Sequence, residues 1–317
     1  MEAAPNLAHI AEKDAALDEV VARLRAADPN GSRAATTFRS TYDQLYDGQH
    51  TGRYQWEDLY KTEKTHYGTL IEINLRREFN DVIDDGRLLD YKVNGHDIDC
   101  KYSHQFGGWM LPPESFGQLL LVCTASDEHS TWSMGVIRAR DEFRREGANR
   151  DGKVGLNQLG RENIIWLHRD AVLPPNVLLQ LPPADLKAIF DNRSGQRRLN
   201  ELFRRANNRR IGRNTVATVA QQDDYMKRVR ANGGSRTALA KEGFIIPGGD
   251  YASHIAVAEK LGIVVPQPGE FVSVRVAEAQ PNSPQSVELE GRWWRVALPS
   301  DPVTSSAPLL PGTVEGL

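Results

Sequence analysis

Apolar side chains recur at intervals of three and four residues along residues 7–27, 36–46 and 61–79. This spacing is typical of helices that bury one face. In the third stretch, Glu72 lies beside the apolar stripe. The pattern predicts three amphipathic helices, the last of which brings a carboxylate to the border of its buried face.

A charged hairpin is predicted by DYKVNGHDIDCK at residues 90–101. Asn94-Gly95 favours a two-residue type I′ turn, because both central positions need positive φ and these residues tolerate it. Alternation along the strands gives one face Asp90, Lys92, Asp97, Asp99 and Lys101, and the other face Tyr91, Val93, Ile98, Cys100 and Tyr102. Asp90 then lies opposite Asp99, and facing carboxylates weaken a hairpin unless a cation lies between them.

The residues alone leave two interpretations of this charged face. It is either a solvated surface on which Lys92 pairs with Asp97 and Lys101 with Asp99, or a site for Mg²⁺, which takes one or two carboxylates and keeps several waters. In the second case Lys101 could hold an attacking water or offset developing charge. The Asp-x-Lys pattern occurs four times in the chain, so only the hairpin geometry distinguishes this pair.

Short apolar runs at residues 118–126 and 131–139 predict two further strands. Helices that feed a hairpin and two strands make a mixed α/β sheet with one charged edge. Proline pairs at 174–175 and 182–183 indicate a junction between domains. We expect one domain at residues 1–170, a linker at 171–183 and a second domain at 184–317.

The second domain begins with a basic, helical stretch at residues 184–220. Residues 222–230 and 235–243 then predict two short helices around a Gly-containing turn, with Ser235 as the N-cap of the second helix. In an alternative register, the two helices lie at 213–220 and 224–231. Strands are expected at 244–247, 270–276 and 286–298. This order is that of a winged helix-turn-helix, whose second helix enters the major groove of DNA.

Length and composition describe an ordinary globular protein. The chain has 317 residues, 40% hydrophobic and 26% charged, which suits two domains with their own cores. It has no run of about 18 apolar residues and no secretory signal, so we expect a cytoplasmic protein without a membrane span. Cys100 and Cys123 lie in apolar runs, which favours buried thiols over a disulfide or a zinc site.

The net charge of −3 hides a strong asymmetry. Residues 193–241 carry thirteen Lys and Arg against three acids, a charge of +10 that leaves −13 for the rest of the chain. A basic block in an acidic protein is the footprint expected of contact with a phosphate backbone, although a solvated helix face has the same composition.

Six stretches of the chain resemble one family of enzymes nearly end to end. They are TYDQLYDGQHTGR at 41–53, KTEKTHYGTLIEINL at 61–75, DCK at 99–101, WMLPPES at 109–115, NELFRR at 200–205 and ATVAQQDDYMKRVR at 217–230. The chain is similar on these stretches to the NaeI restriction endonucleases, two-domain enzymes of type IIE. The family name of the nuclease motif implies a proline where Leu89 stands, and the NaeI branch also lacks it.

The resemblance implies a fold and a catalytic site. The expected fold is a PD-(D/E)xK endonuclease domain, a mixed sheet flanked by helices, followed by a DNA-binding domain with a winged helix-turn-helix like that of catabolite activator protein. The expected catalytic residues are Glu72, Asp90, Asp99 and Lys101, with Asp90, Asp99 and Glu72 as ligands of Mg²⁺.

The resemblance also implies partners and a substrate. It implies a homodimer in a restriction-modification system that cleaves double-stranded DNA at GCCGGC and is activated by a second DNA copy at the C-terminal domain. Candidate contacts of that second copy are Arg228, Arg230, Ser235 and Arg236, which flank the expected turn. Two alternatives stay open: a winged-helix regulator without catalysis, and a repair nuclease that reads the shape of DNA.

Overall fold

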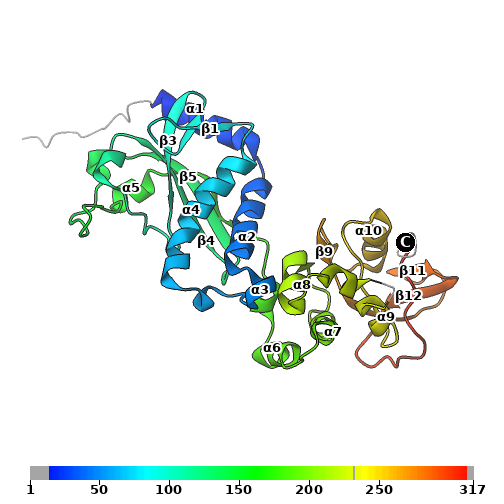
Figure 1. Ribbon diagram of the computed structural model, residues 1–317. Coiled ribbons are helices and arrows are strands. Elements are labelled where there is room, and N and C mark those ends of the chain that lie inside the picture. The colour runs from blue at the N-terminus through cyan, green and yellow to red at the C-terminus, as the bar shows by residue number, and fades with distance from the viewer. Residues whose placement is uncertain (1–13, 231–232, 313–317) are drawn as a thin grey trace, which may run out of the picture. The chain divides into compact units, whose positions relative to one another are not determined.

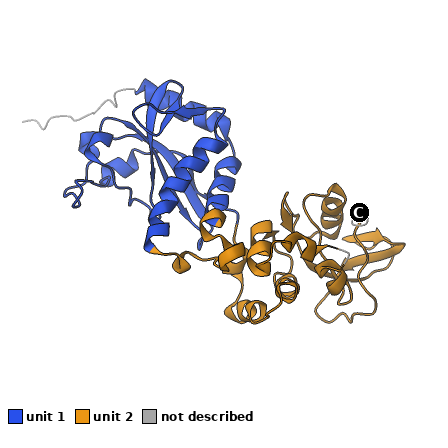
Figure 2. Ribbon diagram, viewed as in Figure 1, with its two compact units in different colours: residues 1–42, 61–174 blue, residues 43–60, 175–317 orange. Residues whose placement is uncertain are grey.

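The computed structural model describes residues 14–230 and 233–312 (Figure 1). The chain forms two compact units (Figure 2). Residues 1–42 and 61–174 make up the first unit, and residues 43–60 and 175–317 make up the second. The mixed α/β character expected from the sequence is confirmed. No helix within the described ranges has the length and hydrophobicity to cross a membrane.

The described part of the first unit is built on a six-stranded sheet. The strands follow chain order, and all neighbours are antiparallel except the parallel pair of β3 and β4. Their bounds are β1 Ile83–Asp85, β2 Tyr91–Val93, β3 His96–Tyr102, β4 Leu119–Ser126, β5 Thr131–Arg138 and β6 Ile165–Val172. The strands expected at 118–126 and 131–139 are confirmed as β4 and β5.

Three long helices accompany this sheet: α1 at Ala15–Ala27, α2 at Ser32–Tyr46 and α4 at Lys61–Glu78 (Figure 1). Tyr67 of α4 packs against Tyr102 of β3 with ring centroids 4.8 Å apart. On the opposite face, Trp109 and its apolar neighbours cover β4 and β5, close to the short helix α5 at Gln158–Glu162.

The helical spacing of the sequence is confirmed where the structure describes it. Residues Tyr67, Ile71, Leu75 and Phe79 are all buried, so α4 hides one stripe as its pattern predicts. Asp14 caps α1 by accepting a hydrogen bond from the Leu17 N–H at 3.1 Å. The part of the first expected helix at residues 7–13 lies outside the described residues.

The hairpin has the register that the Asn94-Gly95 turn predicts. Both turn residues have positive φ, 50° and 86°, as a type I′ turn requires. The paired positions are Tyr91 with Ile98, Lys92 with Asp97 and Val93 with His96. Four residues of the expected apolar face are buried, namely Tyr91, Val93, Ile98 and Cys100, and Tyr102 is half-buried. Cys100 and Cys123 are buried free thiols.

The second unit joins a helical core to a small sheet. Its helices are α3 at Gly48–Thr51, α6 at Pro183–Phe190, α7 at Gly195–Arg205, α8 at Arg213–Ala220, α9 at Ser235–Ala240 and α10 at Ala252–Leu261. Four strands form a sheet in the order β11-β12-β10-β8, with bounds β8 Phe244–Ile245, β10 Val274–Glu278, β11 Ser286–Leu289 and β12 Arg292–Val296. A separate pair joins β7 at Ile211–Gly212 to β9 at Glu270–Phe271. The strands expected beyond residue 243 are therefore present.

Neither expected register of the two short helices is fully right. The first helix of the pair is α8, as in the alternative register. The segment 222–230, which the preferred register expects to be that helix, holds only a 3-10 helix at Tyr225–Val229. The second helix is α9, as in the preferred register. The end of α8 at Ala220 is stabilised by a residue distant in sequence, because Arg198 donates to the Val219 and Ala220 carbonyls at 2.6 and 2.7 Å. These bonds satisfy the last carbonyls of α8, and Gln221 leaves in a left-handed conformation with φ 50°.

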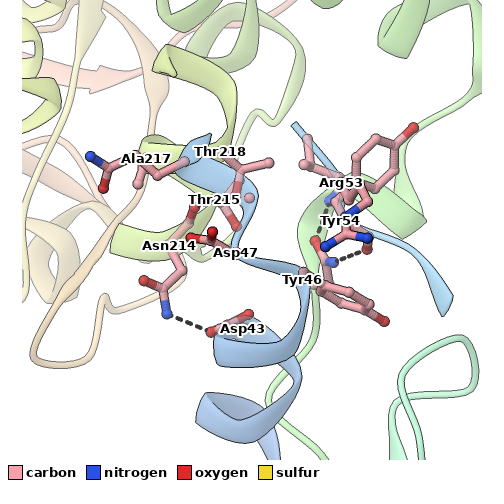
Figure 3. Close-up of a pocket in the computed structure, with 13 residues that line it drawn as sticks. Asp43, Tyr46, Asp47, Arg53, Tyr54, Asn214, Thr215, Ala217 and Thr218 are labelled. Carbon is pink, nitrogen blue, oxygen red and sulfur yellow. Dashed lines mark hydrogen bonds between the residues drawn. The ribbon is translucent and has the colours of Figure 1, made fainter. Parts of the chain in front are cut away.

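Residues 43–60 pack with the second unit, where they line a pocket beside α8 (Figure 3). Asp43 accepts a hydrogen bond from Asn214 at 2.7 Å, and the Tyr54 carbonyl accepts one from Asn176 at 2.8 Å. A Cβ on Gly48 would lie 2.1 Å from the Thr218 hydroxyl oxygen. Glycine is therefore needed at position 48 for this close approach.

Candidate active site

Three elements of the first unit position the expected catalytic residues. Strand β3 carries Asp99 and Lys101, helix α4 carries Glu72, and Asp90 immediately precedes β2. The Tyr91 hydroxyl donates to the Glu72 carbonyl at 2.6 Å, which joins α4 to the hairpin. Strand alternation puts Asp99 and Lys101 on the same face of β3.

Hydrogen bonds fix two of the carboxylates. Asp99 is only 6% exposed, and it accepts from the Lys101 ammonium at 2.6 Å and from the Ser115 hydroxyl at 3.0 Å. Asp90 accepts from the backbone N–H of Cys100 at 2.8 Å. This bond holds the Asp90 carboxylate against β3, the strand that carries Asp99. The hairpin register predicted that these two residues lie opposite each other.

The electrostatics of the cluster favour a bound cation. Burial, followed by a hydrogen bond with Asp99, raises the pKa of Asp90 to about 7. The pKa of Glu72 is also raised, mainly by burial. The positive charge of Lys101 opposes this shift, and the negative charge of Asp99 adds to it. The pKa values of Asp90 and Glu72 are therefore both raised, so a divalent cation would compete with protons for these carboxylates.

The donor set suits a hard cation with few protein ligands. Within the described ranges, no group of three or more His, Cys, Asp and Glu side chains lies close enough to form a metal cage. Mg²⁺ does not need one, since it binds through one or two carboxylates and completes its shell with water and phosphate oxygens. Asp90 and Asp99 fit that requirement.

The solvated-face interpretation holds for only one of its two pairs. Lys101 does pair with Asp99. Lys92 and Asp97 are paired in the strand register, but no ion pair joins them among the described side chains, and one buried oxygen of Asp97 has no hydrogen-bond partner. These two residues take no part in the cluster.

Ser115 is a site residue that the sequence analysis did not single out. It lies at the end of a 3-10 helix at Pro113–Ser115 and is 1% exposed. Its only signal in the sequence is its place in WMLPPES, one of the stretches that carry the family resemblance. Sixteen residues separate it from Asp99, so no local pattern could connect them.

The candidate DNA contacts of the second unit have unequal environments. Arg230 is exposed, whereas Arg228 is half-buried and pairs with Asp224 at 3.1 Å. Ser235 is the first residue of α9 and not its N-cap, and its buried hydroxyl donates to Asn200 at 2.8 Å. Arg236 lines a pocket beside Arg213 and Arg230.

Much of the basic block has structural partners. Arg204 pairs with Glu201 and Glu242, Arg205 pairs with Asp185 and Glu201, and Arg213 pairs with Asp250. Arg198 caps α8. The charge of +10 counted along the sequence therefore overstates what this region can offer to a ligand.

Comparison with known proteins decides the family. The family model of the restriction endonuclease NaeI matches residues 18–305. The chain belongs to the NaeI restriction endonuclease family. It is 47% identical to the type II restriction enzyme NaeI of Lentzea aerocolonigenes over 309 residues, which are 95% of this chain and 96% of that protein. Membership in the NaeI family makes the chain a restriction endonuclease, and the expected resemblance is confirmed.

Proposed function

We propose that the chain is a type IIE restriction endonuclease that hydrolyses phosphodiester bonds of double-stranded DNA with Mg²⁺. The observation that carries this proposal is the meeting of Asp90, Asp99 and Lys101 at strand β3, where Asp90 accepts from the Cys100 N–H and Asp99 accepts from Lys101. The NaeI family assignment supports the reaction class.

Each residue of the site has a proposed role. Asp90 and Asp99 would hold Mg²⁺, with Glu72 as a further ligand, directly or through water. When bound, the ion supplies positive charge that polarises a phosphoryl oxygen. Lys101 holds the attacking water and offsets the charge that develops as the phosphodiester is displaced in line. Ser115 orients Asp99 through its hydrogen bond.

The domains and partners follow the NaeI family. Residues 1–170, apart from the segment 43–60 that packs with the second unit, would form the PD-(D/E)xK endonuclease domain. Residues 184–317 would form a DNA-binding domain with a winged helix-turn-helix, and residues 171–183 would join the two. A helix, α9, followed by β8 and the antiparallel strands β10, β11 and β12 supports the second assignment. The enzyme would act as a homodimer on the palindrome GCCGGC, and a second copy of DNA bound by the second unit would activate cleavage.

One experiment tests the chemistry and the target together. The purified protein is incubated with plasmids that carry two, one or no GCCGGC sites, in Mg²⁺ and in EDTA, and the ends produced are sequenced. Discrete fragments that require Mg²⁺ and end within GCCGGC are expected, with faster cleavage of the two-site plasmid. Discrete ends elsewhere would reject the target sequence, and equal rates on one and two sites would reject activation. Tight binding without any cleavage would favour a regulator.

A further inference from the structure

A pocket of about 260 Å³ in the second unit has an unusual set of charges. Its lining includes Arg213, Arg230, Arg236, Asp250, Tyr251 and Phe271. The three guanidinium groups face a single carboxylate, which leaves the pocket with a charge of +2 if all four groups are ionised.

Arg236 is the residue of this pocket that most needs a ligand. Its Nε donates to the Ile246 carbonyl at 2.9 Å, and its guanidinium lies 5.9 Å from the centre of the Phe271 ring. Its Nη2 is buried and has no hydrogen-bond partner in the described structure. A buried cation without a counter-charge is costly to maintain.

The neighbouring groups do not provide that counter-charge. Asp250 is already engaged, because one oxygen accepts from Arg213 at 2.8 Å and the other accepts from the Gly269 N–H at 2.9 Å. His254, which is fully buried, accepts from the Gly248 N–H at 3.1 Å. Burial, then the charge of Arg236, lowers the pKa of His254 to about 4, so this histidine is neutral at pH 7.

We propose that this pocket holds a backbone phosphate of the DNA bound by the second unit, with Arg236 as its deep contact and Arg230 as its outer contact. A phosphodiester carries one negative charge, which would compensate the charge of the Arg236 guanidinium. Arg230 and Tyr251 are exposed, so the pocket can be reached from solvent. This inference rests on the proposed function and refines it, because Arg236 then fixes the position of the DNA and reads no base.

The salt dependence of binding distinguishes a phosphate contact from a base contact. Binding of the full chain to a GCCGGC duplex and to an unrelated duplex is measured in EDTA over a range of KCl concentrations. Arg236→Gln should weaken binding to both duplexes by the same factor, about ten- to a hundredfold. The slope of log K against log salt should become shallower by about 0.9, because the variant neutralises one phosphate fewer.

Two further variants control for folding and for charge. Arg230→Gln changes an exposed side chain and should produce the same uniform loss of affinity, to a smaller extent. Lys187→Gln removes an exposed cation of α6 that is paired with Asp191 outside the pocket, and it should leave affinity and slope unchanged. A loss confined to the GCCGGC duplex, or unchanged binding in both pocket variants, would overturn the proposal.

Binding of free anions tests the phosphate pocket independently of the proposed enzyme function. Inorganic phosphate, compared with chloride at equal ionic strength, should raise the melting temperature of the wild type more than that of Arg236→Gln or Arg230→Gln. If the protein cleaves GCCGGC but both pocket variants bind DNA as the wild type does, only this inference fails. Stabilisation by phosphate or by deoxynucleoside monophosphates without any binding of duplex DNA would reject the DNA assignment in favour of a small-anion site.

Discussion

The backbone N–H of Cys100 donates to the carboxylate of Asp90 at 2.8 Å, so strand β3 fastens one acidic residue while it carries another, Asp99. A main-chain donor cannot rotate away as a side chain can. The Asp90 carboxylate is therefore held against its own repulsion from Asp99, and a cation at this position would gain from an arrangement that already exists.

Replacement of Asp99 should abolish cleavage and spare DNA binding. Asp99→Ala removes a proposed ligand of Mg²⁺ and the partner of Lys101, so we expect the single-turnover cleavage rate to fall by about a thousandfold or more. Asp97→Asn, on the same face of the hairpin but outside the cluster, is the matched control and should cleave normally. Near wild-type cleavage by Asp99→Ala would reject the catalytic assignment.

Loss of the Ser115 hydroxyl should weaken the site without destroying it. Ser115→Ala removes one hydrogen bond to a charged acceptor, which corresponds to about a tenfold to hundredfold effect. We expect a higher Mg²⁺ concentration at half-maximal rate, measured by titration of the metal in cleavage assays. Ser126→Ala, on β4, is the control. An unchanged metal dependence with a lower melting temperature would show that Ser115 is only structural.

The raised pKa of Asp90 should link protons to stability and to the metal. Its folded pKa of about 7 lies above the usual value of 3.8, so the folded protein keeps a proton that the unfolded chain releases. The contribution of Asp90 to stability is fully present below about pH 4 and is lost as the pH rises toward 7. The free energy of unfolding of Asp90→Asn, measured in EDTA relative to that of the wild type, should therefore increase as the pH rises from 5 to 8.

The same proton competes with the metal. Apparent affinity for Mg²⁺ should increase with pH until Asp90 is ionised near pH 7. Calorimetric titration at pH 6 and pH 8 measures this change and the protons released. Equal affinity at both pH values, or a wild-type stability curve parallel to that of Asp90→Asn, would contradict the raised pKa.

Two glycine substitutions should have opposite effects on stability. In Gly48→Ala the new Cβ would lie 2.1 Å from the Thr218 hydroxyl oxygen and 2.8 Å from the Arg53 carbonyl oxygen, so we expect a loss of about 1–3 kcal/mol in the free energy of unfolding. In Gly68→Ala the nearest atom is the Tyr102 Cβ at 3.7 Å. This helix position should gain about 0.5–1 kcal/mol. Chemical denaturation measures both, and a neutral Gly48→Ala would contradict the tight packing of residues 43–60.

The sequence by itself determined the local geometry of the catalytic hairpin. Asn94-Gly95 sets a turn type, the turn sets the register, and the period of two assigns each side chain to a face, so Asp90 and Asp99 meet through neighbours in the chain. Helix α4 was equally predictable, because its apolar stripe has the period of a helix.

Only the tertiary structure decided the features that depend on distant residues. Arg198 ends α8 by capping its carbonyls from α7, and Asp43–Tyr60 packs with the second unit although it precedes α4 in the chain. The contact of the buried Asp99 with Ser115 and that of Arg236 with the Ile246 carbonyl likewise depend on how distant parts of the chain fold together. Local periodicity contains no information on such contacts, because burial and hydrogen bonding between distant residues arise only when the chain is packed.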